Sequence, residues 1–126
     1  LIDMGEITDI TKEESIATFI AGIVRSVRFG FASSHGKANM MCYNYMEKNG
    51  AFSRNEEGKW VIDFEKAAEC INSWANLIIE TQATGNVEFA KAYSAENASI
   101  GEALAADIEK INGAGIPRDI VFDFAW

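Results

Sequence analysis

Apolar residues recur every three or four positions along most of this chain, which is the spacing of amphipathic α-helices. The first such stretch predicts a helix over 12–29 with one buried face, made of Ile16, Phe19, Ile20, Ile23, Val24 and Val27. Thr11 and Glu14 stand at capping-box spacing, in which each side chain bonds the backbone N–H of the other residue. Gly30 is suited to end this helix.

A second helix is predicted over 34–48. Ser33-Ser34 is its start signal, and Gly50 after Asn49 is its stop signal. Its predicted buried stripe consists of Ala38, Met41, Cys42 and Tyr45. Because only a short turn separates the first two helices, we expect them to pack as a helical hairpin.

Residues 51–63 break the helical period. Two short segments, 51–54 and 59–62, flank a polar stretch that contains Gly58, and this arrangement indicates a β-hairpin. A two-stranded hairpin is only marginally stable by itself, so we expect it to lie against a helix.

The rest of the chain returns to the helical period. Asp63 is suited to cap a long helix over 64–83 that Gly85 ends, and a shorter helix is predicted over 87–95. The buried face predicted for the long helix is Phe64, Ala68, Ile71, Ala75 and Ile78.

One more helix is predicted after Ser99 and Glu102, which have the spacing of a second capping box. Its apolar stripe is Ile100, Leu104, Ile108 and Ile111, and its stop signals are Gly113, Gly115 and Pro117. Residues 119–126 are expected to form an extended tail. The predicted fold is therefore mainly α: one domain over 1–126, a bundle of about five helices with one small β-hairpin.

Charge narrows the classes of partner. The chain has 19 acidic and 11 basic side chains and a net charge of −8, so it repels phosphate backbones and no nucleic-acid partner is expected. No apolar stretch reaches the ~20 residues that span a bilayer, and no basic run would grip a membrane surface. The chain starts at Leu1 without a signal-peptide pattern, and we expect it to begin inside a longer protein.

The metal-binding residue types are few. Cys42 and Cys70 each fall inside a predicted helix, and we interpret them as buried free thiols rather than as a disulfide. Catalytic zinc normally takes three protein ligands, among which histidine dominates. His35 is the only histidine, so we predict no metal site and no bound cofactor in this chain.

His35 has two interpretations. It falls in the first turn of the second predicted helix, where a surface or capping histidine is the simpler one. The functional interpretation is an imidazole at a helix N-terminus beside a cleft, where the helix dipole disfavours the charged ring. Such a ring can donate a hydrogen bond to a developing oxyanion. Gly36 would let a ligand or another backbone segment come close.

Other polar and aromatic residues have plainer interpretations. Glu13 and Glu14 are adjacent and point about 100° apart on a helix, so they suit capping better than catalysis. The remaining helix carboxylates are interpreted as solvated faces, namely those of Glu65, Glu69, Glu80, Glu102, Asp107 and Glu109. Tyr45, Trp60 and Trp74 are interpreted as core or interface aromatics.

Five blocks of the sequence follow one another in a characteristic order: Arg25-Ser26-Val27-Arg28-Phe29-Gly30, Ser33-Ser34-His35-Gly36-Lys37-Ala38-Asn39-Met40, Asn49-Gly50-Ala51-Phe52, Val61-Ile62-Asp63-Phe64-Glu65-Lys66 and Gly115-Ile116-Pro117-Arg118-Asp119-Ile120-Val121-Phe122. In these blocks the chain resembles bacterial dipeptidyl-peptidase III-like metallopeptidases. The similarity covers about residues 15–122. It implies that the chain is the C-terminal part of such a peptidase and belongs to a larger helical lobe.

The resemblance implies a function for the parent protein. Family members are zinc exopeptidases that remove dipeptides from the amino end of short peptides, and their zinc ligands lie upstream on a split H-E-x-x-x-H motif and a Glu-Glu-x-x-Ala-acid motif. The histidine that matches His35 lies near the active cleft and contacts the substrate or transition state. Asn39, one turn later, is a weaker candidate for a substrate contact. The partners so implied are the upstream zinc-bearing part and short peptides.

Two departures from the family pattern limit what carries over. The histidine motif is absent here, and although residues 13–17 mimic the second motif, Thr18 stands in its acidic position. More distant members have arginine where Asn39 stands. An alternative remains open, a free-standing helical interaction module derived from the peptidase. Some relatives also carry a Nudix domain. In the isolated chain we expect an exposed apolar patch that drives homodimerisation.

Overall fold

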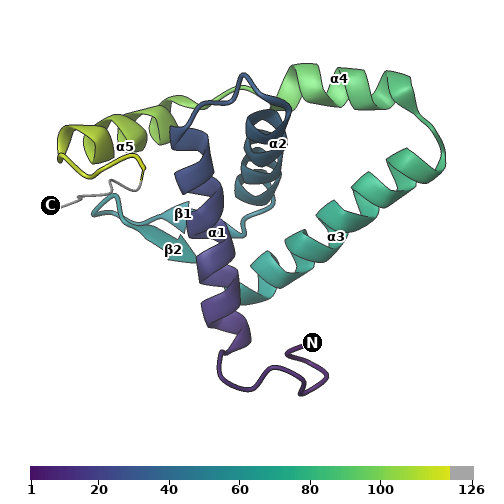
Figure 1. Cartoon of the computed structure of the whole chain (residues 1–126), viewed down its shortest axis with the longest axis horizontal. Coiled ribbons are helices and arrows are strands. Elements are labelled where there is room, and N and C mark those ends of the chain that lie inside the picture. The colour runs from purple at the N-terminus through teal and green to yellow at the C-terminus, as the bar shows by residue number, and fades with distance from the viewer. Residues whose placement is uncertain (120–126) are drawn as a thin grey trace, which may run out of the picture.

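Five helices and one two-stranded antiparallel sheet make up residues 1–119, the part of the chain that the computed structural model describes (Figure 1). In chain order they are α1 (Lys12–Arg28), α2 (Ser34–Lys48), β1 (Phe52–Arg54), β2 (Trp60–Ile62), α3 (Phe64–Ala83), α4 (Val87–Asn97) and α5 (Glu102–Gly113). The prediction of a mainly α fold with one hairpin is confirmed. Most of the tail predicted over 119–126 lies outside the described residues.

Local capping explains why the helices begin where they do. The Glu14 N–H donates to Thr11 Oγ1 at 3.1 Å, and the Thr11 N–H donates to Glu14 Oε2 at 2.8 Å, so the predicted capping box is present. The Ser33 hydroxyl accepts from the Gly36 N–H at 3.1 Å at the start of α2, and Asp63 caps α3 in the same way. These short-range bonds satisfy backbone donors that have no partner inside the helix.

The second predicted capping box is wrong. Helix α5 begins after Gly101, which makes no side-chain cap hydrogen bond, and Ser99 lies before the helix. The Asn44 amide of α2 donates to the carbonyl oxygens of Asn97 and Ser99, at 2.8 and 2.9 Å. This side chain holds the connection between α4 and α5 against α2, and the N-cap of α5 is Gly101 rather than Ser99.

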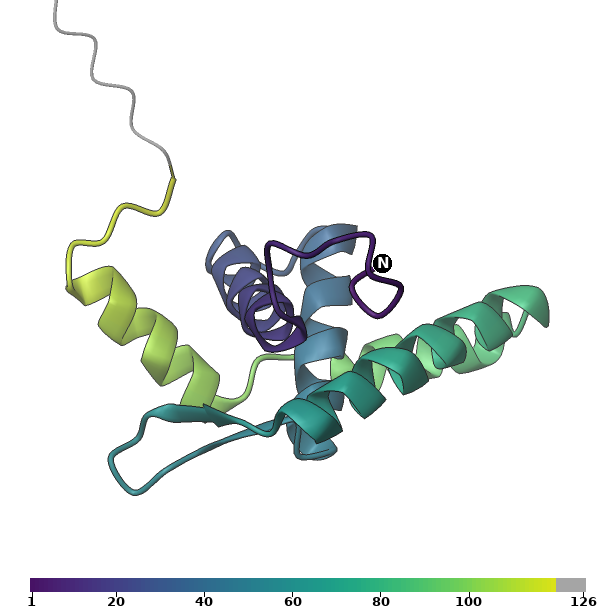
Figure 2. The same ribbon diagram turned by 90° about the horizontal axis from the view of Figure 1, so that it is seen from below.

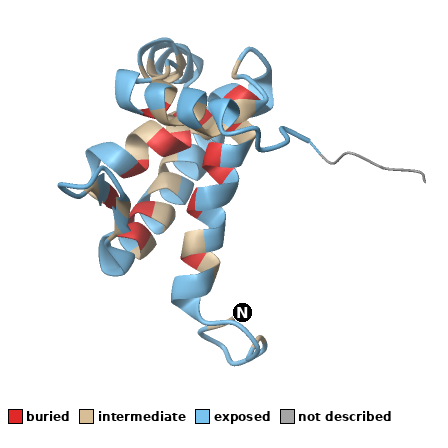
Figure 3. Cartoon of the chain, turned by 90° about the vertical axis from the view of Figure 1, so that its left-hand side faces the viewer, coloured by how far each residue is buried: buried red, intermediate tan, exposed pale blue. Residues whose placement is uncertain are grey.

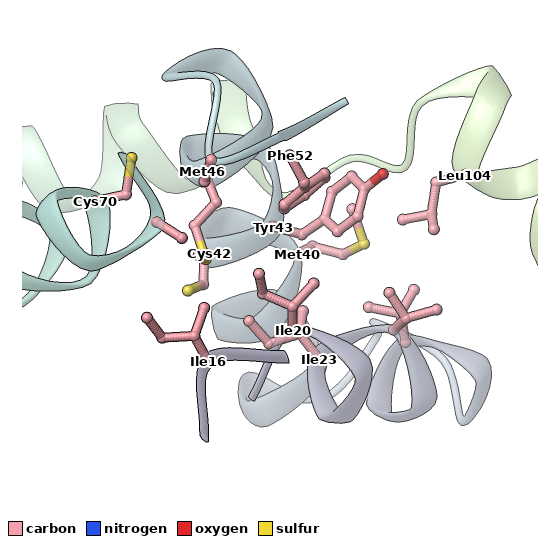
Figure 4. Packing of buried hydrophobic residues seen from close by; sticks show 14 residues of the cluster. Ile16, Ile20, Ile23, Met40, Cys42, Tyr43, Met46, Phe52, Cys70 and Leu104 are labelled. Atoms are coloured by element: carbon pink, nitrogen blue, oxygen red, sulfur yellow. The ribbon is translucent and has the colours of Figure 1, made fainter. Parts of the chain in front are cut away.

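The core forms where α1 packs against α2, so the two helices joined by the short turn are in contact, as predicted. Figure 4 shows isoleucines of α1 facing Met40 and Tyr43 of α2, with Phe52, Cys70 and Leu104 reaching the same cluster from β1, α3 and α5. In Figure 3 the buried positions gather on α1 and α2, whereas α4 has none. The two cysteines are buried and free, as predicted.

The predicted stripe of α2 is only partly correct. Cys42 is buried, but Ala38 is exposed, and the deepest positions are Met40, Tyr43 and Met46. Helix α2 touches α1, α3, α4 and β1. A helix surrounded on several sides has no single buried face, so one stripe could not describe it.

The predicted face of α3 is only partly correct, since Ala68 and Ile71 pack against the core. Its buried residues are Ala67 and Cys70, whereas Phe64, Ala75 and Ile78 are exposed. Figures 1 and 2 show the reason: only the first half of α3 lies beside α1 and α2, and its second half extends away from them. Apolar residues in that half have little core to meet.

The hairpin lies against α2, as expected. Residue pairing is antiparallel, with Phe52 opposite Ile62 and Arg54 opposite Trp60. The Phe52 ring lies 5.0 Å from that of Tyr43 and stacks on Trp60 at 5.6 Å, measured between centroids. Burial of these rings supplies the stability that a two-stranded sheet lacks by itself.

Candidate functional site

The turn between α1 and α2, residues 29–36, forms a tightly packed corner that we call the α1–α2 corner. Gly30 adopts φ 103°, which favours glycine, and it turns the chain. Gly36 is buried, and a Cβ atom there would lie 2.4 Å from the Gly30 carbonyl oxygen and 2.6 Å from Phe31 Cα. The close approach predicted at Gly36 is therefore made by the chain's own backbone.

His35 projects from this corner. It occupies the first turn of α2, next to buried Gly36, and its side chain is exposed. Within residues 1–119 the imidazole takes part in no hydrogen bond or ion pair. Its backbone is fixed by the Ser33 cap and by the contact between Gly30 and Gly36, so an accessible imidazole stands on a rigid support.

Asn39 lies one turn after His35 on the same row of α2. Its side chain is half-buried, and Nδ2 donates to Ser26 Oγ of α1 at 2.6 Å. The amide nitrogen is thus engaged in joining α2 to α1. This contact fixes the turn of α2 that carries His35.

The position of His35 suits interaction with negative charge. Unpaired backbone N–H groups gather in the first turn of an α-helix and give that end a partial positive charge. A neutral imidazole has one N–H donor, and a protonated ring has two. The corner can therefore offer hydrogen-bond donors to a carbonyl oxygen or an oxyanion of a bound ligand.

A second polar cluster joins β1 to α5 and was missed in the sequence. Asp107 Oδ2 accepts hydrogen bonds from Arg54 Nη2 at 2.7 Å, Arg54 Nε at 3.1 Å and Trp60 Nε1 at 2.9 Å. The hydrogen bonds from Arg54, and to a lesser extent that from Trp60, lower the pKa of Asp107. The interpretation of Asp107 as part of a solvated helix face was wrong.

Arg54 extends this cluster to α2. Its Nη1 atom lies 3.2 Å from Glu47 Oε1, which also accepts from the Tyr43 hydroxyl at 3.0 Å. Burial raises the pKa of Tyr43, so the phenol stays protonated and donates. These bonds link β1 and β2 to α2 and α5.

An apolar groove lies on the side of α2 that faces α3 and α4. A cavity of about 300 Å³ lies between α2, α3 and α4, and we call it the α2–α3–α4 groove. Its lining includes Ala38, Met41, Trp74, Ile78, Phe89 and Tyr93. Ile78 and Phe89 are each 38% exposed. Since Ala38 is three residues after His35 on α2, one end of the groove lies near the α1–α2 corner.

No group of three or more His, Cys, Asp or Glu side chains within residues 1–119 is arranged to hold a metal ion. Burial, and to a smaller extent neighbouring Cys70, raise the pKa of Cys42 to about 11, so this thiol is a poor ligand at neutral pH. In the same part of the chain, no helix is both long and apolar enough to cross a bilayer.

No protein-family model matches the chain. The structure of DPP III from Caldithrix abyssi superposes with a TM-score of 0.86 at 28% identity, over 94% of this chain and 22% of that one. Dipeptidyl-peptidase III from Corallococcus sp. strain EGB gives a TM-score of 0.87 at 26% identity, over 96% of this chain and 22% of that one.

A further relative is longer still. Nudix hydrolase 3 of Arabidopsis thaliana is 29% identical over 120 residues, which are 95% of this chain and 16% of that protein. The chain thus spans less than a quarter of each protein that it matches. The predicted resemblance to dipeptidyl-peptidase III is confirmed by the two structures, and it extends over nearly all of this chain.

Proposed function

We propose, from this similarity to dipeptidyl-peptidase III, that the chain is the C-terminal part of a zinc-dependent dipeptidyl peptidase and forms one wall of its substrate cleft. The observation that carries the proposal is His35, an accessible imidazole without a partner in residues 1–119, on a helix end locked by Ser33 and Gly36. Because the backbone of His35 is fixed before the ligand binds, only the rotation of its side chain has to be ordered on binding.

In this proposal the chain's own residues bind and orient the peptide. His35 donates a hydrogen bond to the carbonyl oxygen of the scissile bond, and this bond strengthens as negative charge develops. Asn39 holds α2 against α1 through Ser26 and so positions the ring. Zinc, held by residues upstream of this chain, would supply an activated water molecule. The isolated chain would not hydrolyse peptides.

The test is made in the full-length peptidase. His35→Ala should lower kcat about 10²- to 10³-fold, as loss of an oxyanion donor does, while the zinc content stays unchanged. Ser34→Ala is the matched control, because Ser34 is an exposed neighbour in the same helical turn and should leave kcat unchanged. Unchanged turnover in His35→Ala would reject a role in the reaction.

A second candidate is a free-standing interaction module derived from the peptidase. The apolar α2–α3–α4 groove favours it, because exposed apolar patches mark interaction sites. The gene sequence before Leu1 separates the two: a split H-E-x-x-x-H motif there supports the peptidase, and a start codon supports the module. We propose no Nudix hydrolase activity, because the match covers only 16% of that protein.

A further inference from the structure

Phe29, at the end of α1, is the centre of a cationic patch that also contains Arg25, Arg28 and Arg118, and we call it the arginine patch. The guanidinium carbons of Arg25 and Arg118 lie 5.3 and 5.4 Å from the centroid of the Phe29 ring. The ring is 41% exposed. Cation–π contact with a ring restrains a guanidinium group, while the N–H groups at its edge remain free to donate.

Hydrogen bonds of Arg28 hold the chain segment that brings Arg118 to Phe29. Arg28 Nε and Nη2 donate to Asn112 Oδ1 at 3.1 and 2.9 Å, and Nη2 also donates to the Ile116 carbonyl oxygen at 3.0 Å. These bonds fasten the segment that follows α5 to α1. Arg118, two residues beyond Ile116, is therefore held beside the end of α1 by contacts independent of its own side chain.

The arginine patch gathers cations that form no ion pair within residues 1–119. The chain has a net charge of −8, and the ion pairs within residues 1–119 use Lys12, Arg54, Lys59, Lys66 and Lys91. Arg25, Arg28 and Arg118 are in none of these pairs. Within this part of the chain Arg25 and Arg118 also donate no side-chain hydrogen bond, so their N–H groups can donate to an anionic ligand.

The patch borders the candidate site. Phe29 precedes Gly30, whose carbonyl oxygen packs on Gly36 beside His35. We propose that the arginine patch binds the free carboxylate of a short peptide whose backbone passes His35, an inference that rests on the proposed function. A guanidinium fork matches a planar carboxylate, and the Phe29 ring offers apolar contact to the neighbouring peptide side chain.

The experiment uses the isolated 126-residue chain, labelled with ¹⁵N and titrated with tetra-alanine or with tetra-alanine amide. The free acid should shift the side-chain Nε–Hε signals of Arg25 and Arg118 and should bind about tenfold more tightly than the amide. Arg25→Gln combined with Arg118→Gln should abolish this preference. Lys48→Gln, which removes an exposed cation at the far end of α2, should preserve it.

Three results would overturn the proposal: equal affinity for acid and amide, a preference that survives in the double variant, or displacement of the peptide by an equal concentration of inorganic phosphate. The last would identify a general anion patch. If circular dichroism shows that the double variant is unfolded, Arg25→Gln replaces it. The titration involves no hydrolysis, so its outcome is separate from the effect of His35→Ala on turnover.

Discussion

Arg54 of β1 and Asp107 of α5 are joined by two hydrogen bonds to a single carboxylate oxygen, across 53 residues of sequence. Asp107→Asn removes the charge that both bonds depend on and leaves Glu47 as the charged partner of Arg54 within residues 1–119. Because both side chains are only partly exposed, we expect the free energy of unfolding to fall by about 1–2 kcal/mol at pH 7. Urea unfolding followed by circular dichroism measures it.

The same pair predicts a pH dependence. The Arg54 hydrogen bonds lower the pKa of Asp107 in the folded chain, so its contribution is present above the unfolded pKa of about 3.9 and is lost as the pH falls through the lower folded value. The deficit of Asp107→Asn should therefore shrink below about pH 4. Glu109→Gln, on an exposed part of α5, should show no such deficit, and a pH-independent deficit in Asp107→Asn would contradict the account.

Two glycines should respond to alanine with opposite signs. In Gly36→Ala the new Cβ would meet backbone atoms of Gly30 and Phe31, which cannot move away easily, so stability should fall by about 1–3 kcal/mol. Gly22 is exposed inside α1, and a Cβ atom there would have nothing within 4 Å, so Gly22→Ala should raise stability by about 0.5–1 kcal/mol. Unfolding in urea distinguishes them, and equal effects would refute the packing at the α1–α2 corner.

The two thiols should be unreactive in the folded chain. Burial raises the pKa values of both, that of Cys42 to about 11, so little thiolate forms at pH 8. Ellman's reagent should label neither Cys42 nor Cys70 within minutes in buffer and should label both in urea. Fast labelling of the folded chain at two equivalents would show that these residues are not buried.

Self-association of the isolated chain should depend on the α2–α3–α4 groove. The groove leaves apolar residues exposed, and we propose that two copies of the isolated chain pair through it. Ile78→Lys places a charge in the groove lining and should weaken dimerisation at least about tenfold in sedimentation equilibrium. Val61→Lys alters an exposed apolar residue of β2 and should have no effect. If the isolated chain without substitutions stays monomeric at high concentration, this prediction is refuted.

The helix boundaries could be predicted because capping is local. Thr11, Ser33 and Asp63 lie within three residues of the N–H groups that they bond, so short-range sequence contains the whole signal. Ser99 had the same spacing, but α5 starts after Gly101, and the Ser99 carbonyl oxygen is bonded by the distant Asn44 side chain. Nothing in residues 99–102 shows that distant contact.

Buried faces and paired charges were harder to predict, because both depend on contacts between segments that are far apart in the sequence. The burial of the apolar residues of α3 depends on which half of the helix meets α1 and α2, and the pairing of Asp107 depends on a strand far away in the sequence. For the candidate site, sequence supplied the residue type and helix position of His35. It could not supply the Ser26–Asn39 bond or the backbone contact at Gly36, which fix the orientation of α2.

The amide of Asn44 spans 53 residues to reach the carbonyl oxygen of Asn97. Closing a loop of that length costs chain entropy before any contact repays it, whereas α1, α2 and the hairpin assemble from neighbouring segments. The first half of the chain can therefore reach its native arrangement early, and α5 docks late. A substitution that weakens the contact between Asn44 and the α4–α5 connection should therefore raise the unfolding rate more than it lowers the refolding rate.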